Sequence, residues 1–174
     1  MTIVHAPSDT MGFYESHPSR QAILKFATIE PPSPLTITEP KLPIDDKDGG
    51  CDTEGDKSYR AWKRQHPGLR VDDGDFISDK GSEIYNMIRA RSIQTLLVMG
   101  VHTNMCILNR SFAIRQMTRW GISCILVRDL TDAMYDPKDA PHVSHQQGTE
   151  LVIQHIESYW GPTVVSNDLL RTLR

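Results

Sequence analysis

The chain has 174 residues, 39% of them hydrophobic, which suits one domain around a single core. Its formal net charge of −3, its lack of a Lys/Arg block and its aromatic content of 7% argue against nucleic-acid binding, and no apolar run approaches the ~20 residues of a membrane span. Three cysteines, an odd number, argue against a disulfide framework and favour the reducing cytoplasm.

The first part of the chain predicts little regular structure. Residues 3–4 indicate the end of a strand, and apolar residues at helical spacing predict a helix over 19–27 with Ser19 as its cap. Residues 31–58 contain five prolines and then an acidic, glycine-rich stretch, so we expect an irregular insertion there. A short strand is expected at 69–71.

Strands and helices alternate in the second part. Ser82 is the expected cap of a helix whose apolar face carries Ile84, Met87 and Ile88. Apolar runs predict strands and amphipathic stretches predict helices, in the order strand 95–101, helix 106–120, strand 122–127, helix 146–160 and strand 163–165. This alternation predicts a three-layer α/β/α protein with a mostly parallel sheet, in one domain over residues 1–174.

Cys106 is the most informative residue. It follows the strand at 95–101 and a polar corner, at the point where a helix is predicted to begin. Helical N–H groups and the helix dipole stabilise a thiolate, and the carboxyl end of a sheet is where α/β proteins bind ligands. The alternative is a buried cysteine that packs as a small hydrophobe, as we expect for Cys124, whereas Cys51 lies in the acidic loop.

Several polar residues are candidates for a site around Cys106. His102 precedes it by four residues and is either a base or electrostatic partner of the thiolate, or a surface imidazole. Asp129 and Tyr135 follow the next strand, so they either line a pocket at the same sheet edge or hold a loop together. Thr103, in the corner itself, is a further pocket candidate.

The N-terminal loop offers no recognisable metal site. His5 and Asp9 are kept as pocket candidates, because the spacing of His5, Asp9 and His17 matches no defined metal site. The acidic loop from residue 46 lacks the ligand pattern of calcium loops. With no phosphate loop and no dinucleotide fingerprint, we expect neither a metal nor a cofactor.

The motifs taken together resemble the isochorismatase-like cysteine hydrolase family, which includes nicotinamidases and N-carbamoylsarcosine amidases. The resemblance is carried by residues 97–107, Leu-Val-Met-Gly-Val-His-Thr-Asn-Met-Cys-Ile, which are similar to the family's strand, corner and nucleophile. The stretches 81–84 and 127–133 resemble the flanking helix start and strand end. The resemblance covers residues 69–166 and, more loosely, 1–30.

The resemblance implies a six-stranded parallel sheet between helices and a Cys106 nucleophile acting on a small amide or a related small molecule. It also implies a cis peptide bond between Val101 and His102, and an oxyanion hole formed by the backbone N–H groups of His102 and Cys106. A small-molecule substrate, no cofactor and association into homo-oligomers follow from the same resemblance.

Two features depart from the family pattern. The family's Asp ends a central first strand, whereas residues 1–7 resemble the end of the second strand, so that Asp is not evident. The position of the family's Lys falls near Asp73, and Lys80 is the nearest candidate. These departures leave open a non-catalytic family member, either a binder of small molecules or an assembly unit.

Overall fold

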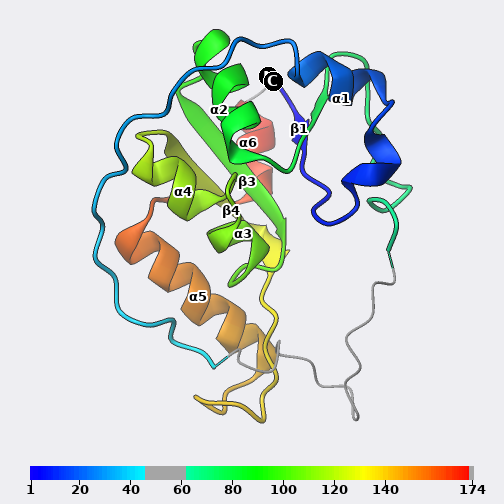
Figure 1. Cartoon of the computed structure of the whole chain (residues 1–174). Helices are drawn as coiled ribbons and strands as arrows, with labels where there is room; N and C mark the ends of the chain where they lie inside the picture. The colour runs from blue at the N-terminus through cyan, green and yellow to red at the C-terminus, as the bar shows by residue number, and fades with distance from the viewer. Residues whose placement is uncertain (46–61, 173–174) are drawn as a thin grey trace. The chain divides into compact units, whose positions relative to one another are not determined.

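The computed structural model describes residues 1–45 and 62–172, which fall into two compact units (Figure 1). The first unit consists of residues 1–31 and 62–93, and the second of residues 32–45 and 94–172. Cys51 and the part of the predicted insertion from residue 46 to 58 lie outside the described residues.

The first unit is a small parallel pair of strands with helices. Its elements are β1 (Val4–His5), a 3₁₀ helix (Met11–Tyr14), α1 (Pro18–Ile23), β2 (Phe76–Ile77) and α2 (Gly81–Ala90). In the register, Val4 lies opposite Phe76 and His5 opposite Ile77. The predicted apolar face of the second helix is confirmed, because Ile84, Met87 and Ile88 of α2 are all buried.

The expected strand at 69–71 is wrong, and the strand lies at β2 instead. Leu69 is 60% exposed, whereas Phe76 and Ile77 are buried. A turn closed by the Asp75 N–H on the Asp72 carbonyl precedes β2. Pairing with β1 and burial therefore decide the position of the strand, and a short apolar run carries information about neither.

Both predicted helix caps are wrong. The ring of His17 caps α1 by accepting the N–H of Ser19, and Pro18 fills the first helical position, where its missing N–H costs nothing. α2 already begins at Gly81, so Ser82 lies inside the helix, and the capping position belongs to Lys80, which makes no side-chain cap bond.

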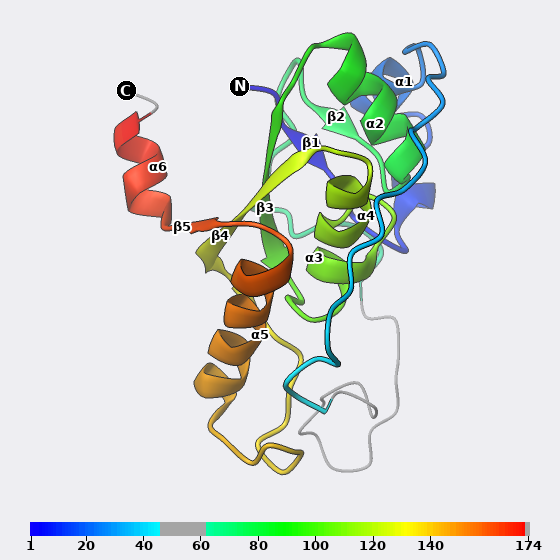
Figure 2. The ribbon, with the colours of Figure 1, turned by 90° about the vertical axis from the view of Figure 1, so that its left-hand side faces the viewer.

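The second unit contains a three-stranded parallel sheet in the order β3-β4-β5. Its elements are β3 (Thr95–Val101), α3 (Cys106–Asn109), α4 (Ile114–Arg119), β4 (Ser123–Asp132), α5 (His145–Tyr159), β5 (Thr163–Val164) and α6 (Ser166–Thr172). Figure 2 shows α3 and α4 on one side of the strands and α6 on the other, so this unit has three layers. The predicted α/β class with parallel strands is confirmed.

Two element boundaries in this unit differ from the prediction. β4 does not end at Val127 but continues to Asp132, because pairing resumes after an irregularity and sets Thr131 opposite Gly100. The helix predicted over 106–120 is broken, because Arg110 has an extended backbone with ψ 159° and a new helix begins at Ile114. A single helix dipole therefore does not run through this region.

The core of the second unit lies between its sheet and its helices. Its fully buried side chains include Leu108, Met117, Leu126, Val152 and Ile156. β3 is covered less than its apolar sequence predicts, since Met99 is 47% and Val101 58% exposed. Within this unit β3 is an edge strand, which explains the difference.

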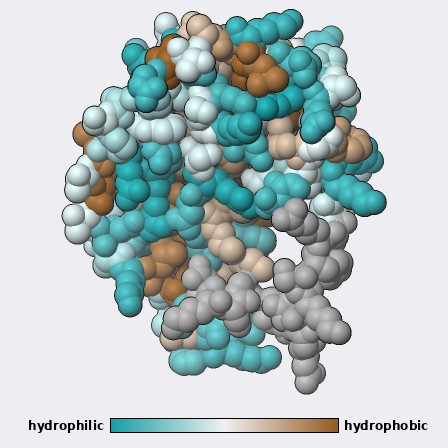
Figure 3. Space-filling model, viewed as in Figure 1, coloured by the Kyte–Doolittle hydropathy of each residue, from teal (hydrophilic) through white to brown (hydrophobic). Residues whose placement is uncertain are grey.

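The segment 32–45 runs along the second unit without helix or strand (Figure 1). The Leu35 N–H donates to the Arg119 carbonyl at 2.9 Å, and the Asp45 N–H donates to the Ala140 carbonyl at 2.8 Å. The face drawn in Figure 3 is mostly hydrophilic with scattered hydrophobic patches. Among the described residues, no helix combines the length and apolar character needed to cross a membrane.

Candidate functional site

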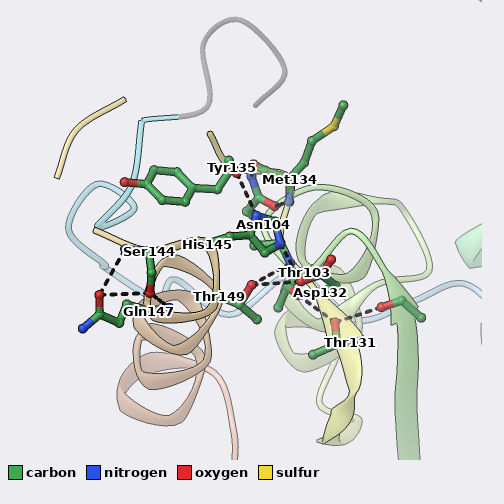
Figure 4. A network of polar contacts seen from close by, with 12 residues as sticks. Thr103, Asn104, Thr131, Asp132, Met134, Tyr135, Ser144, His145, Gln147 and Thr149 are labelled. Carbon is green, nitrogen blue, oxygen red and sulfur yellow. Dashed lines mark hydrogen bonds and ion pairs between the residues drawn. The ribbon is translucent and has the colours of Figure 1, made fainter. Parts of the chain in front are cut away.

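The carboxyl ends of β3 and β4 bring the predicted corner together with an acidic residue. Val101, the last residue of β3, lies opposite Asp132, the last residue of β4. Beyond the strands, the Thr103 N–H donates to the Asp132 carbonyl at 2.8 Å. The turn that leads to Cys106 is therefore fixed to the end of β4, at the edge where parallel sheets bind ligands (Figure 4).

Within the described part of the chain, the backbone around Cys106 has two N–H groups without an acceptor. The Val101–His102 peptide bond is cis, and the His102 carbonyl accepts the N–H groups of Met105 and Ile107, both at 3.1 Å. The N–H groups of His102 and Cys106 themselves have no acceptor among the described residues. Cys106 itself is partly exposed, in contrast to the buried Ile107 and Leu108 that follow it.

Two buried side chains brace this turn. The Thr103 and Thr131 hydroxyls lie 2.7 Å apart, and that of Thr131 donates to the Gly100 carbonyl at 2.8 Å. Asn104 accepts the Met134 N–H at 2.8 Å and donates to the Met134 carbonyl at 3.0 Å (Figure 4). Thr103, predicted to line a pocket, is fully buried and holds the corner to β4.

A cluster that the sequence analysis did not single out lies at the end of β4. The Asp132 Oδ1 atom lies 2.9 Å from His145 Nε2 and accepts the Thr149 hydroxyl at 3.1 Å (Figure 4). Ser144 forms a capping box with Gln147, which places His145 at the first position of α5. The sequence Ser-His-Gln-Gln was the available signal, but it says nothing about Asp132.

Burial shifts the pKa values of His102 and of Cys124. Burial lowers the pKa of His102, and the charge of Asp132 acts against that shift. Burial raises the pKa of Cys124 to about 11, so that thiol is inert at neutral pH. Cys124 is buried, as expected for a core cysteine, whereas Cys106 is not.

Asp129 and Tyr135 have structural partners. The Asp129 carboxylate accepts the backbone N–H of Ser166 at 2.8 Å and its hydroxyl at 2.5 Å, which holds the start of α6. The buried Tyr135 donates its hydroxyl to the Asp139 carbonyl at 2.9 Å and accepts the Val143 N–H at 3.2 Å. Asp129 thus contacts the start of α6, and Tyr135 contacts its own loop.

His5, Asp9 and Lys80 belong to the first unit. The His5 ring bridges Asp75 at 3.1 Å and Gln65 at 3.2 Å, and Asp9 has a positive φ of 63°. Lys80 is largely exposed, with its Nζ 3.7 Å from Glu83. Among residues 1–45 and 62–172, no group of acidic, histidine and cysteine side chains is arranged to hold a metal ion.

One comparison with known proteins found a similar fold. No family model and no curated protein matches the chain. It is similar to the crystal structure of a cysteine hydrolase from Pseudomonas syringae pv. phaseolicola 1448A, with a TM-score of 0.52 and 22% identity over 61% of this chain. The chain spans about half of that protein, 52% of its length. The likeness supports the predicted three-layer α/β/α fold.

Proposed function

We propose that this chain is an isochorismatase-like cysteine hydrolase that acts on a small amide or a related small molecule through the thiolate of Cys106. The observation that carries the proposal is the corner itself: a partly exposed cysteine beside two backbone N–H groups that have no acceptor among the described residues. The similarity of the fold to a cysteine hydrolase supports it. The proposed setting is the cytoplasm, with the chain in a homo-oligomer.

The chemistry is acyl transfer. The Cys106 sulfur attacks the substrate carbonyl, a C–S bond forms, and the carbonyl oxygen becomes negative. The N–H groups of His102 and Cys106 are the proposed donors to that oxygen, and each such donor contributes about 3 kcal/mol to stabilising the transition state. The C–N bond then breaks, the amine takes a proton from solvent as it leaves, and water hydrolyses the thioester.

The alternative is a non-catalytic member of the same fold that binds a small molecule. Two observations favour it. α3 has only four residues, so it supplies little of the dipole that stabilises a thiolate, and no Lys stands near Asp73, where the resemblance implies one.

Alkylation separates the two functions. Iodoacetamide at neutral pH, followed by mass spectrometry of the peptides, measures the rate constant at each cysteine. We expect Cys106 to react much faster than Cys51 and than Cys124, whose buried thiol serves as the slow internal standard. Cys106→Ala removes the fast phase and leaves the others unchanged. Equal rates at Cys106 and Cys51 would favour the binder.

A further inference from the structure

We infer that Asp132 is the general base of the Cys106 site and that His145 and Thr149 position it. This assignment rests on the proposed hydrolase function and deepens it. The resemblance implies a catalytic Asp on a first strand that is not evident here, whereas Asp132 comes from the end of β4 in the second unit.

The two oxygens of Asp132 are in different situations. Oδ1 lies 2.9 Å from His145 Nε2 and accepts the Thr149 hydroxyl at 3.1 Å. Oδ2 has no hydrogen-bond partner among the described residues, and the side chain is 55% exposed. One oxygen is therefore anchored while the other is free to take a proton from a small molecule, which is the arrangement that a general base needs.

His145 holds the Asp132 carboxylate in position and is not itself the base. Its Nδ1 lies 2.9 Å from the Tyr135 carbonyl, and its Nε2 faces the Asp132 carboxylate. The ring thus spans the Tyr135 carbonyl and the Asp132 carboxylate, which holds Oδ1 in place.

Thr149 links the Asp132 carboxylate to the backbone of Ala133. Its hydroxyl oxygen accepts the Ala133 N–H at 3.1 Å while the hydroxyl donates to Asp132. Its hydrogen is thereby committed to Asp132 Oδ1, and α5 and the loop after β4 hold the carboxylate together (Figure 4).

The segments that carry Asp132 and Cys106 both contact His102 or its neighbours in the chain. Asp132 lies opposite Val101 and accepts the Thr103 N–H through its carbonyl, and its charge acts on the His102 ring. On the Cys106 side, the His102 carbonyl accepts the Ile107 N–H at 3.1 Å. The backbone of Asp132 and the start of α3 therefore both join the turn at His102, which links the carboxylate's strand end to the turn that carries Cys106.

The assigned step is the hydrolysis of the thioester. A water oxygen attacks the carbonyl carbon attached to the Cys106 sulfur, and Asp132 Oδ2 accepts the proton that the water loses. The C–S bond then breaks, its electron pair stays on sulfur as the thiolate, and the carboxylic acid leaves. Asp132 returns its proton to solvent, so the enzyme is unchanged after the cycle.

Hydrolysis of p-nitrophenyl acetate by the full chain tests this assignment. Its leaving group needs no protonation, so the burst of nitrophenolate reports acylation of Cys106 and the later steady rate reports deacylation. We expect Asp132→Asn to keep the burst and slow deacylation by ~10²–10⁴-fold, so that acetyl-Cys106 accumulates in the mass spectrum. Asp168→Asn, an exposed carboxyl on α6, is the matched control with wild-type rates.

The positioning residues give a second measurement. Thr149→Ser keeps the hydroxyl and is expected to deacylate faster than Thr149→Val, and His145→Gln, which keeps one donor, faster than His145→Ala. If Asp132→Asn fails to fold, these pairs decide the question.

The outcomes distinguish the two claims. A wild-type chain that never forms acetyl-Cys106 overturns the proposed function and this assignment with it. A wild-type burst combined with unchanged deacylation in Asp132→Asn, or with equal deacylation within both pairs, overturns the role of Asp132 and leaves the hydrolase standing.

Discussion

The indole N–H of Trp160 donates to the Glu39 carboxylate across 121 residues of sequence, with 2.7 Å between Nε1 and Oε2. The same oxygen lies 2.7 Å from Arg115 and 2.7 Å from His155 Nε2. Trp160 and His155 are buried, and the carboxylate itself is only 14% exposed. One carboxylate therefore ties the segment 32–45 to α4 and α5.

Replacing this carboxylate should weaken the second unit. Glu39→Gln removes the charge that pairs with Arg115 and leaves a guanidinium, on a side chain only 20% exposed, without its charged partner. We expect a loss of roughly 1–3 kcal/mol in the free energy of unfolding, measured by urea denaturation. Glu30→Gln, an exposed glutamate, is the control and should stay within about 0.5 kcal/mol of wild type. A stability equal to that of Glu30→Gln would contradict the role of the cluster.

The same cluster predicts a dependence on pH. Burial by itself raises the pKa of Glu39, but the hydrogen bonds from Arg115, His155 and Trp160 outweigh it, and the pKa is lowered from its ordinary value of 4.5. A lowered pKa means that the stabilisation is present above the ordinary value and lost as the pH falls through the lowered one. The stability difference between wild type and Glu39→Gln should therefore shrink below pH 4.5, as thermal unfolding at several pH values would show. A constant difference would argue against it.

Gly148 in α5 packs closely against the ring of Tyr135, and a substitution there tests this packing. An alanine inside a helix normally stabilises by about 0.5–1 kcal/mol, but a Cβ here would lie 2.3 Å from the ring of Tyr135. Both hydrogen bonds of the Tyr135 hydroxyl hold that ring in place. We therefore expect Gly148→Ala to destabilise by roughly 1–3 kcal/mol in calorimetry. Gly12→Ala, with nothing within 4 Å of the new Cβ, should not.

Asn104 makes a two-way bond with the backbone of Met134 that holds the Cys106 turn to the loop after β4. Asn104→Ala leaves a backbone N–H and a carbonyl unpaired next to a buried position. We expect roughly 2–3 kcal/mol of lost stability and faster alkylation of Cys106 as the turn loosens. Unfolding and labelling measured on the same variant check both effects, and unchanged labelling would mean that Thr103 alone holds the turn.

The local sequence was informative where the spacing of apolar residues by itself determines whether a segment is a strand or a helix. The strand predicted over 95–101 has the bounds of β3, and the helix predicted over 146–160 differs from α5 by one residue at each end. The corner that ends in Cys106 was visible for the same reason, because Gly100 interrupts an apolar run and polar residues follow. These features depend on neighbours a few residues away.

Only the tertiary structure decided which polar residues meet. Asp132 reaches the corner because β4 continues past the predicted end at Val127 and pairs with Val101, 31 residues earlier in the chain. The break after Asn109 and the displacement of β2 to residues 76–77 likewise depend on what packs against them. Hydrophobic periodicity records which face of an element is buried, whereas register and side-chain partners depend on distant residues, so local patterns cannot encode them.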